Sequence, residues 1–192
     1  MAPTVRVIAF DAATWRELGP RMEELERQEW GPRAFSQREM RWQATNRDAI
    51  VATTWDGPLF VGFAVAGPAW SEAHASLLNV LIDPAYRGRG LVWPLIAAVE
   101  RELLARGIDE LEIDARVDNG FADAVERRYG TRATVIQADH ASPYGLQRTL
   151  RVRIAEGASR PRRTRAAPRS RTLRPPGGGR GRPAARIPPP MR

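Results

Sequence analysis

The chain has 192 residues, of which 30 are basic and 22 acidic, and none is cysteine. The absence of cysteine excludes disulfides and thiolate catalysis and is compatible with a cytoplasmic location. We expect no signal peptide in residues 1–11 and no membrane span, because the longest apolar stretch, 61–70, is far shorter than the roughly 20 residues needed to cross a bilayer. All 30 basic residues are arginine, and 11 of them but no acidic residue follow residue 156.

The first third of the chain carries the patterns of short strands and amphipathic helices. Apolar residues at helical spacing in 12–30 predict a helix, which we expect the Gly-Pro pair at 19–20 to interrupt. Ser36 with Glu39 three residues later is a capping-box signature and predicts a second helix from there to about residue 46. Strands are predicted at 5–10, 49–54 and 59–66, the last two joined by an Asp-Gly turn.

Residues 77–104 combine a strand, a basic glycine-rich turn and a helix. The nearly unbroken apolar run 77–82 predicts a strand buried on both faces, which the following Asp-Pro pair ends. Arg87-Gly-Arg-Gly90 then opens a helix whose apolar residues share one face. Free backbone N–H groups at the helix start, the helix dipole and two arginines together predict a site for a phosphate or pyrophosphate.

The remainder of the chain predicts a folded part followed by a tail. The predicted elements are a strand with one polar face at 109–117, a short helix at 119–128 ended by Gly130, and closing strands at 134–137 and 146–154. Residues 157–192 are rich in Arg, Pro, Gly and Ala and cannot bury enough apolar surface to offset the entropy of ordering. We therefore expect one folded domain at 1–156 and a disordered basic tail at 157–192.

The order of these elements and the motif Asp83-Pro-Ala-Tyr-Arg-Gly-Arg-Gly90 resemble the GNAT superfamily of acyl-CoA N-acyltransferases over residues 4–154. The resemblance implies an α/β (α+β) fold with a mixed, mostly antiparallel sheet, a splayed central strand pair and flanking helices. It also implies an N-acetyltransferase that moves an acetyl group from acetyl-CoA, its co-substrate, to an amine of a small molecule or protein in a ternary complex. No metal is expected.

The same resemblance implies which residues would hold the cofactor. The pantetheine arm would pair with the backbone of a strand, and the pyrophosphate would bind the N–H groups of the turn that follows. Asn119 matches an asparagine often placed near the cofactor, whereas Val92 stands where the family has glycine or alanine. The implied cofactor residues are Val80, Leu81, Ile82, Arg87, Gly88, Arg89, Gly90, Leu91, Val92 and Asn119.

The candidate catalytic residues are two possible acids and three possible bases. Glu126 occupies the place where the family commonly has the tyrosine that protonates the departing thiolate, and Tyr129 lies about one helical turn later. Tyr129 and Glu126 are therefore the candidate acids. Asp114 is the candidate base, with Asp118 and Glu72 as alternatives.

Two other functions stay open on the sequence alone. Val92 and Glu126 motivate the second reading, a non-catalytic acyl-CoA-binding sensor or partner domain of the same fold. A dinucleotide-binding domain is the third reading, because Gly88-x-Gly90 follows a strand, although Trp93 stands where its third glycine belongs. The basic tail is able to attract nucleic acid non-specifically, but it lacks interleaved aromatic residues, and we favour a passive tail.

Overall fold

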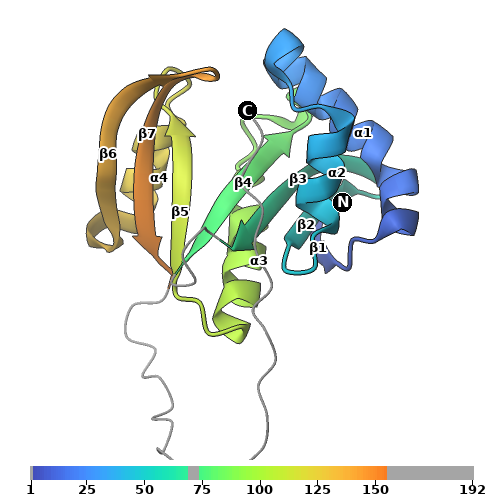
Figure 1. Cartoon of the computed structure of the whole chain (residues 1–192), viewed down its shortest axis with the longest axis horizontal. Helices are drawn as coiled ribbons and strands as arrows, with labels where there is room; N and C mark the ends of the chain where they lie inside the picture. The colour runs from blue at the N-terminus through green and yellow to red at the C-terminus, as the bar shows by residue number, and fades with distance from the viewer. Residues whose placement is uncertain (1, 69–73, 155–192) are drawn as a thin grey trace, which may run out of the picture. The chain divides into compact units, whose positions relative to one another are not determined.

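The computed structural model describes residues 2–68 and 74–154, which form a sheet with helices on both faces (Figure 1). The strands are β1 (Thr4–Ile8), β2 (Ile50–Asp56), β3 (Leu59–Pro68), β4 (Ala75–Ile82), β5 (Glu110–Arg116), β6 (Ala133–Ser142) and β7 (Gly145–Arg153). The helices are α1 (Ala12–Trp30), α2 (Gln37–Thr45), α3 (Val92–Ala105) and α4 (Phe121–Tyr129). The expected tail and Glu72 lie outside the described residues.

The described strands form one seven-stranded sheet in the order β1-β2-β3-β4-β5-β7-β6. The neighbouring strands are antiparallel except β4 and β5, which run parallel. This confirms the expected mixed, mostly antiparallel sheet. β6 extends further than the predicted strand at 134–137. Register shifts at Val135/Gln137 and Gln137/His140 interrupt the alternation of residues by which a strand is recognised in the sequence, so its full length was not predicted.

Each face of the sheet has its own apolar core. On one face α3 and α4 pack against alternate residues of the strands, such as Ala52 and Ala64, which are fully buried. On the other face α1 and α2 cover the intervening residues, including Phe63 and Val65. Because successive strand residues point to opposite faces, the apolar runs in β2 and β3 supply both cores at once.

Two prolines lie inside α-helices, and the one at position 20 does not interrupt its helix as expected. α1 continues through Pro20 without interruption, and its inner face buries Trp15, Met22 and Leu25 to 5%, 1% and 1% exposure. That burial outweighs the one backbone hydrogen bond that proline removes. Pro94 is the third residue of α3, where a backbone N–H has no acceptor within the helix, so it costs no helical bond.

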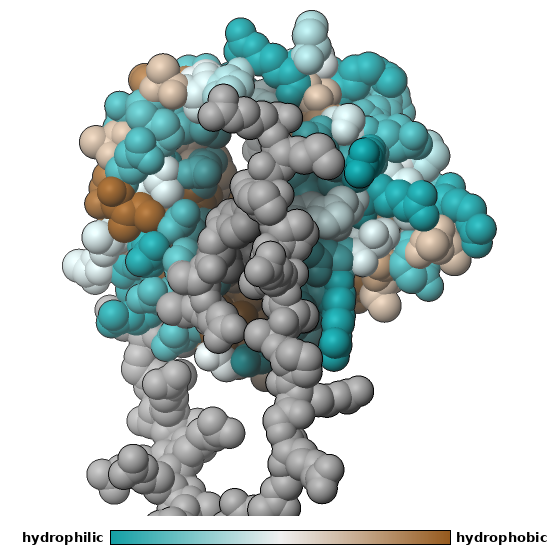
Figure 2. All heavy atoms as spheres, viewed as in Figure 1, coloured by the Kyte–Doolittle hydropathy of each residue, from teal (hydrophilic) through white to brown (hydrophobic). Residues whose placement is uncertain are grey.

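The surface seen in Figure 2 is mainly hydrophilic, with a hydrophobic patch over the β6 edge of the sheet. Val135 and Ile136 of β6 are 45% and 44% exposed. No helix in the two described ranges is long and apolar enough to cross a membrane.

Candidate active site

The two central strands separate part-way along their length. β4 and β5 pair only through Ala75–Leu111, Ser76–Glu112 and Leu77–Ile113, although both strands continue beyond these pairs. Leu78 is an extra residue in β4, since Val65 pairs with Asn79 and Ala66 with Leu77. Such a bulge bends its strand and strengthens the twist, which turns β4 away from β5 (Figure 1).

A cavity of about 920 Å³ occupies the opening between these strands. Its walls come from all of Ser76–Ile82 in β4, from β5, from the turn before α3, and from the end of α1 and the β6–β7 turn. The volume lies in the upper range for small-molecule and cofactor sites. The splayed strand pair implied by the family resemblance is therefore present and opens into a pocket.

The end of β4 offers a free edge to this cavity. Val80, Leu81 and Ile82 pair with Ala64, Phe63 and Gly62 of β3 on one side. On the β5 side, the described strands give none of these three residues a ladder partner. An unpaired strand edge presents backbone N–H and C=O groups that an extended ligand can pair with.

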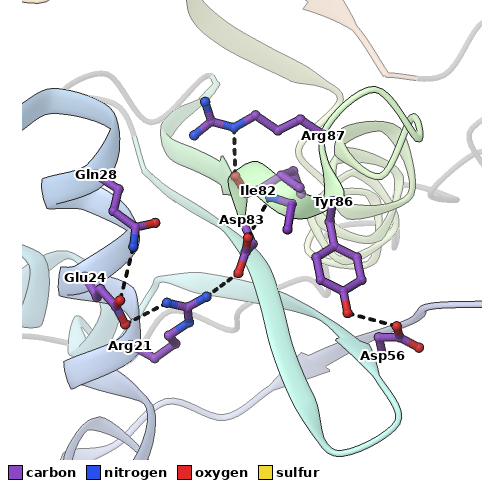
Figure 3. A network of polar contacts seen from close by, with 9 residues as sticks. Arg21, Glu24, Gln28, Asp56, Ile82, Asp83, Tyr86 and Arg87 are labelled. Atoms are coloured by element: carbon purple, nitrogen blue, oxygen red, sulfur yellow. Dashed lines mark hydrogen bonds and ion pairs between the residues drawn. The ribbon is translucent and has the colours of Figure 1, made fainter.

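The turn after β4 is fixed from two directions (Figure 3). Asp83 accepts a hydrogen bond from the Ala85 N–H at 2.8 Å and forms an ion pair with Arg21 of α1. The Tyr86 hydroxyl donates to Asp56 at 3.0 Å, and this bond raises the pKa of the tyrosine. The turn is thus anchored both to α1 and to the β2–β3 hairpin, which holds its backbone in one conformation.

The start of α3 has the geometry of an anion site. Gly88 and Gly90 have φ angles of +74° and +72°, which residues with a Cβ rarely adopt. Leu91 caps the helix without a side-chain hydrogen bond, and Val92 is its first residue. The free N–H groups of this first turn carry partial positive charge and lie beside the cavity, which Gly90, Leu91 and Val92 all line.

The two arginines of the turn are engaged with protein groups. The Arg87 Nε donates to the Ile82 carbonyl at 3.1 Å, and its Nη2 pairs with Glu29 at 2.7 Å. Arg89 donates to the Ala85 carbonyl at 3.1 Å. Arg87 lines the cavity, whereas Arg89 is not among its lining residues in the described chain.

On the opposite wall, Asp114 of β5 lines the cavity as expected for a candidate base. Its Oδ1 accepts a hydrogen bond from the Thr149 hydroxyl at 2.6 Å, which orients the carboxylate. Asn119 also lines the cavity, and its side-chain oxygen accepts the Phe121 N–H at 3.0 Å at the start of α4. Asp118 pairs with Arg116, whose hydrogen bond lowers the pKa of Asp118.

The two candidate acids do not border the cavity. Tyr129 is only 5% exposed, and its hydroxyl donates to Glu100 of α3 at 2.7 Å. Burial, followed by that bond, raises the pKa of Tyr129. Glu126 is held by Arg148 of β7 at 2.6 Å. Neither residue is among the described lining residues, so the acid role expected for them is not supported by their position.

A further wall of the cavity is formed by the end of α1, the segment after it and the β6–β7 turn. Trp30, Phe35 and Tyr144 line the cavity there, with ring centroids 5.1 Å apart for Trp30–Tyr144 and 5.5 Å for Phe35–Tyr144. Trp30 and Phe35 lie close together after the end of α1, whereas Tyr144 comes from the distant β6–β7 turn, so no single spacing in the sequence marks all three. The carboxylate of Glu29, from the last turn of α1, lines the same wall.

A buried polar contact ties this wall to the bulge. Glu26 is fully buried and accepts hydrogen bonds from the Asn79 amide at 2.7 Å and the Phe35 N–H at 3.1 Å. Burial is the main cause that raises the pKa of Glu26, and the two hydrogen bonds oppose it. The contact joins α1 to the residue of β4 that follows the bulge, and so fixes the strand where it diverges.

Residues 13–130 match the family model described as Acetyltransferase (GNAT) family. The chain belongs to this family. The splayed strands and the glycine turn before α3 are the parts through which the family resemblance implies acyl-CoA binding.

Proteins similar to this chain in sequence or in fold include N-acetyltransferases. The [ribosomal protein bS18]-alanine N-acetyltransferase of Haemophilus ducreyi is 29% identical over 80 residues, a match covering 42% of this chain and 54% of that protein. The chain therefore aligns with about half the length of this relative. The ribosomal-protein-S18-alanine N-acetyltransferase of Escherichia coli has a TM-score of 0.62 at 18% identity, covering 83% of this chain and 98% of the other. An aminoglycoside 6′-N-acetyltransferase complexed with coenzyme A has a TM-score of 0.64 at 14% identity, covering 79% and 98%. These two structures share the fold.

Proposed function

We propose that this chain is an acetyl-CoA-dependent N-acetyltransferase that joins the cofactor and an amine in one ternary complex. The observation that carries the proposal is the divergence of β4 from β5 beyond Leu77, which opens a cavity ending at the glycine turn before α3. One edge of that cavity suits an extended pantetheine arm, and its end suits a pyrophosphate. The bound thioester would supply the activated acetyl group.

The residues of the chain would then position the two substrates. The neutral amine would attack the thioester carbonyl, the C–S bond would break, and the second proton lost by the nitrogen would pass to the CoA thiolate that leaves. The backbone of Val80–Ile82 would hold the arm. The N–H groups of residues 88–92 would hold the phosphates, since the Arg87 N–H already donates to the Pro84 carbonyl at 3.3 Å. Asp114, oriented by Thr149, would take the proton from the acceptor ammonium. A backbone N–H near Leu81 would stabilise the negative charge that develops on the carbonyl oxygen. Holding both reactants close together and correctly oriented in one cavity would further accelerate the reaction relative to the reaction in solution.

The acceptor is a primary amine of a small molecule or a protein. The named relatives act on an alanine of a ribosomal protein and on aminoglycosides. The aromatic wall and Glu29 line the side of the cavity formed by the end of α1, the segment after it and the β6–β7 turn, and we propose that the acceptor binds there. A cytoplasmic location and the division into a domain at 1–156 and a tail at 157–192 stay predictions.

The test is calorimetric titration with acetyl-CoA, followed by measurement of free CoA released with a panel of amines. The panel contains a peptide with N-terminal alanine, an aminoglycoside and simple primary amines. We expect saturable binding of acetyl-CoA and release of CoA with at least one amine. Binding without turnover across the panel would favour the non-catalytic acyl-CoA-binding reading. Failure to bind acetyl-CoA, or tighter binding of NADH, would refute the proposal.

A further inference from the structure

Glu29 is shared by the two sides of the cavity. Its Oε2 pairs with Arg87 of the α3 turn at 2.7 Å, and its Oε1 pairs with Arg116 of β5 at 3.0 Å. The Glu29 side chain is only 15% exposed, so these bonds are partly shielded from water. One carboxylate at the end of α1 therefore connects the turn that follows β4 with the strand that diverges from it.

The two arginines depend on Glu29 to different degrees. Arg116 makes two further hydrogen bonds to Asp118, at 2.9 Å and 2.8 Å, so its charge stays paired without Glu29. For Arg87, Glu29 is the one carboxylate partner that the described residues supply. The Arg87–Glu29 pair is therefore the contact that an incoming anion would replace. A phosphate is such an anion, because a guanidinium binds it through short, charge-assisted hydrogen bonds.

If the Arg87 side chain moves from Glu29 to a bound phosphate, one oxygen of the Glu29 carboxylate becomes available within the cavity. The surrounding wall is made of Trp30, Phe35 and Tyr144, and the Arg116 guanidinium already lies 5.0 Å from the centre of the Trp30 ring. The contact with Arg116 shows that a positively charged group packs against an aromatic ring of this wall. A carboxylate beside aromatic rings recognises a primary ammonium carried on an apolar or aromatic group.

We infer that Glu29 binds the ammonium of the acceptor and couples acceptor binding to cofactor binding through Arg87. The inference rests on the proposed function and extends it to the class of acceptor, an aromatic or apolar primary amine. Phosphate draws Arg87 away from Glu29, and Glu29 then accepts the ammonium. Because coupling between two sites is reciprocal, the amine tightens cofactor binding by the same factor as the cofactor tightens amine binding.

Titration with CoA tests this coupling, since CoA carries the phosphates but no acetyl group and permits no turnover. The native chain is titrated alone and with an excess of phenethylamine, which combines an ammonium with a ring. We expect phenethylamine to tighten CoA binding about two- to fivefold, the scale of one partly exposed ion pair. Ethanolamine, which lacks the ring, is the matched amine and should have a smaller effect.

Glu29→Gln should bind CoA about two- to fivefold more tightly than the native chain, because Arg87 no longer has a competing carboxylate. Its affinity should not respond to phenethylamine. Arg87→Gln should weaken CoA binding. In the double variant, Glu29→Gln should no longer increase the affinity for CoA, because the arginine through which it acts is absent. Glu17→Gln, at an exposed position of the same helix, is the control and should behave as the native chain does.

The outcomes separate the inference from the proposed function. Suppose that the native chain binds CoA and that Glu29→Gln binds it with the same or a lower affinity. That result would overturn the inference and leave the proposed function intact. A phenethylamine effect that persists in Glu29→Gln would overturn the inference as well. Absence of CoA binding by the native chain would overturn both. Thermal melting of each variant, compared with the native chain, shows that the folded state is retained during the titrations.

Discussion

Replacement of Gly90 by valine should strongly weaken acetyl-CoA binding while the fold is retained. Gly90 has φ +72°, and a Cβ built at this position meets no atom within 4 Å. The penalty therefore arises from the backbone conformation, which costs an L-residue about 1–2 kcal/mol. For a domain of this size that corresponds to a loss of about 2–8 °C in melting temperature.

The effect on binding should be larger than the effect on stability. If the turn relaxes to a negative φ, its N–H groups no longer point together into the cavity. Loss of two hydrogen bonds to a charged phosphate, at about 1.5 kcal/mol or more each, weakens binding by roughly a hundredfold. Calorimetry with acetyl-CoA measures this loss, and thermal melting measures the stability.

Gly107 provides a matched control at the other end of α3. It has φ +80°, a Cβ there also meets no atom within 4 Å, and it is not among the described residues that line the cavity. Gly107→Val should therefore lower the melting temperature similarly without changing the affinity for acetyl-CoA. Native affinity in Gly90→Val would refute the assignment of the turn as a phosphate site.

Three further substitutions test individual residues. Asp114→Asn should lower kcat about 10²- to 10⁴-fold and leave acetyl-CoA affinity unchanged, as expected for a general base. Tyr129→Phe should cost about 1–3 kcal/mol of stability, because it breaks the buried bond to Glu100, and should leave kcat unchanged. Burial raises the folded-state pKa of Glu26 above 4.5, so the native chain should lose stability relative to Glu26→Gln as the pH rises from about 4.5 through that raised pKa.

Steady-state kinetics and denaturant unfolding at several pH values measure these three effects. Unchanged kcat in Asp114→Asn would assign the base elsewhere. A fall in kcat of a hundredfold or more in a folded Tyr129→Phe would restore Tyr129 as the acid. For Glu26, a stability difference that is constant with pH, or that shifts in the opposite direction, would contradict the effect of burial on its carboxyl group.

Local patterns in the sequence were sufficient to predict most of the fold. Ser36 and Glu39 form the capping box that the spacing predicts, with the Ser36 Oγ accepting the Glu39 N–H at 3.3 Å. Gly130 ends α4 as predicted, at φ +56°. Such features depend on residues within one turn of each other. The continuity of α1 through Pro20 was not predictable in this way, because it depends on burial against strands that are distant in the sequence.

The candidate site was predictable only where it is built from one continuous segment. The turn at Arg87–Gly90 is recognisable from its sequence, because strand end, glycines and helix start follow one another. Glu29 and the aromatic wall are brought together by the packing of α1 and the β6–β7 turn, which no local pattern specifies. The ion-pair partners of the arginines were likewise not predictable from local sequence, since Arg87 pairs with Glu29, which lies 58 positions earlier in the chain.

Position 126 shows why a motif residue and its environment have to be considered together. Arg148 contacts Glu126 at 2.6 Å, Asp139 at 2.7 Å and Asp123 at 3.2 Å, and so joins α4 to β6 and β7. A carboxylate at position 126 fits this cluster because it accepts a hydrogen bond from Arg148 at 2.6 Å, whereas a tyrosine would leave that ion pair unmade. The residue that departs from the family pattern is thus explained by its own packing. The binding half of the site, at the α3 turn and the β4 edge, does not depend on it.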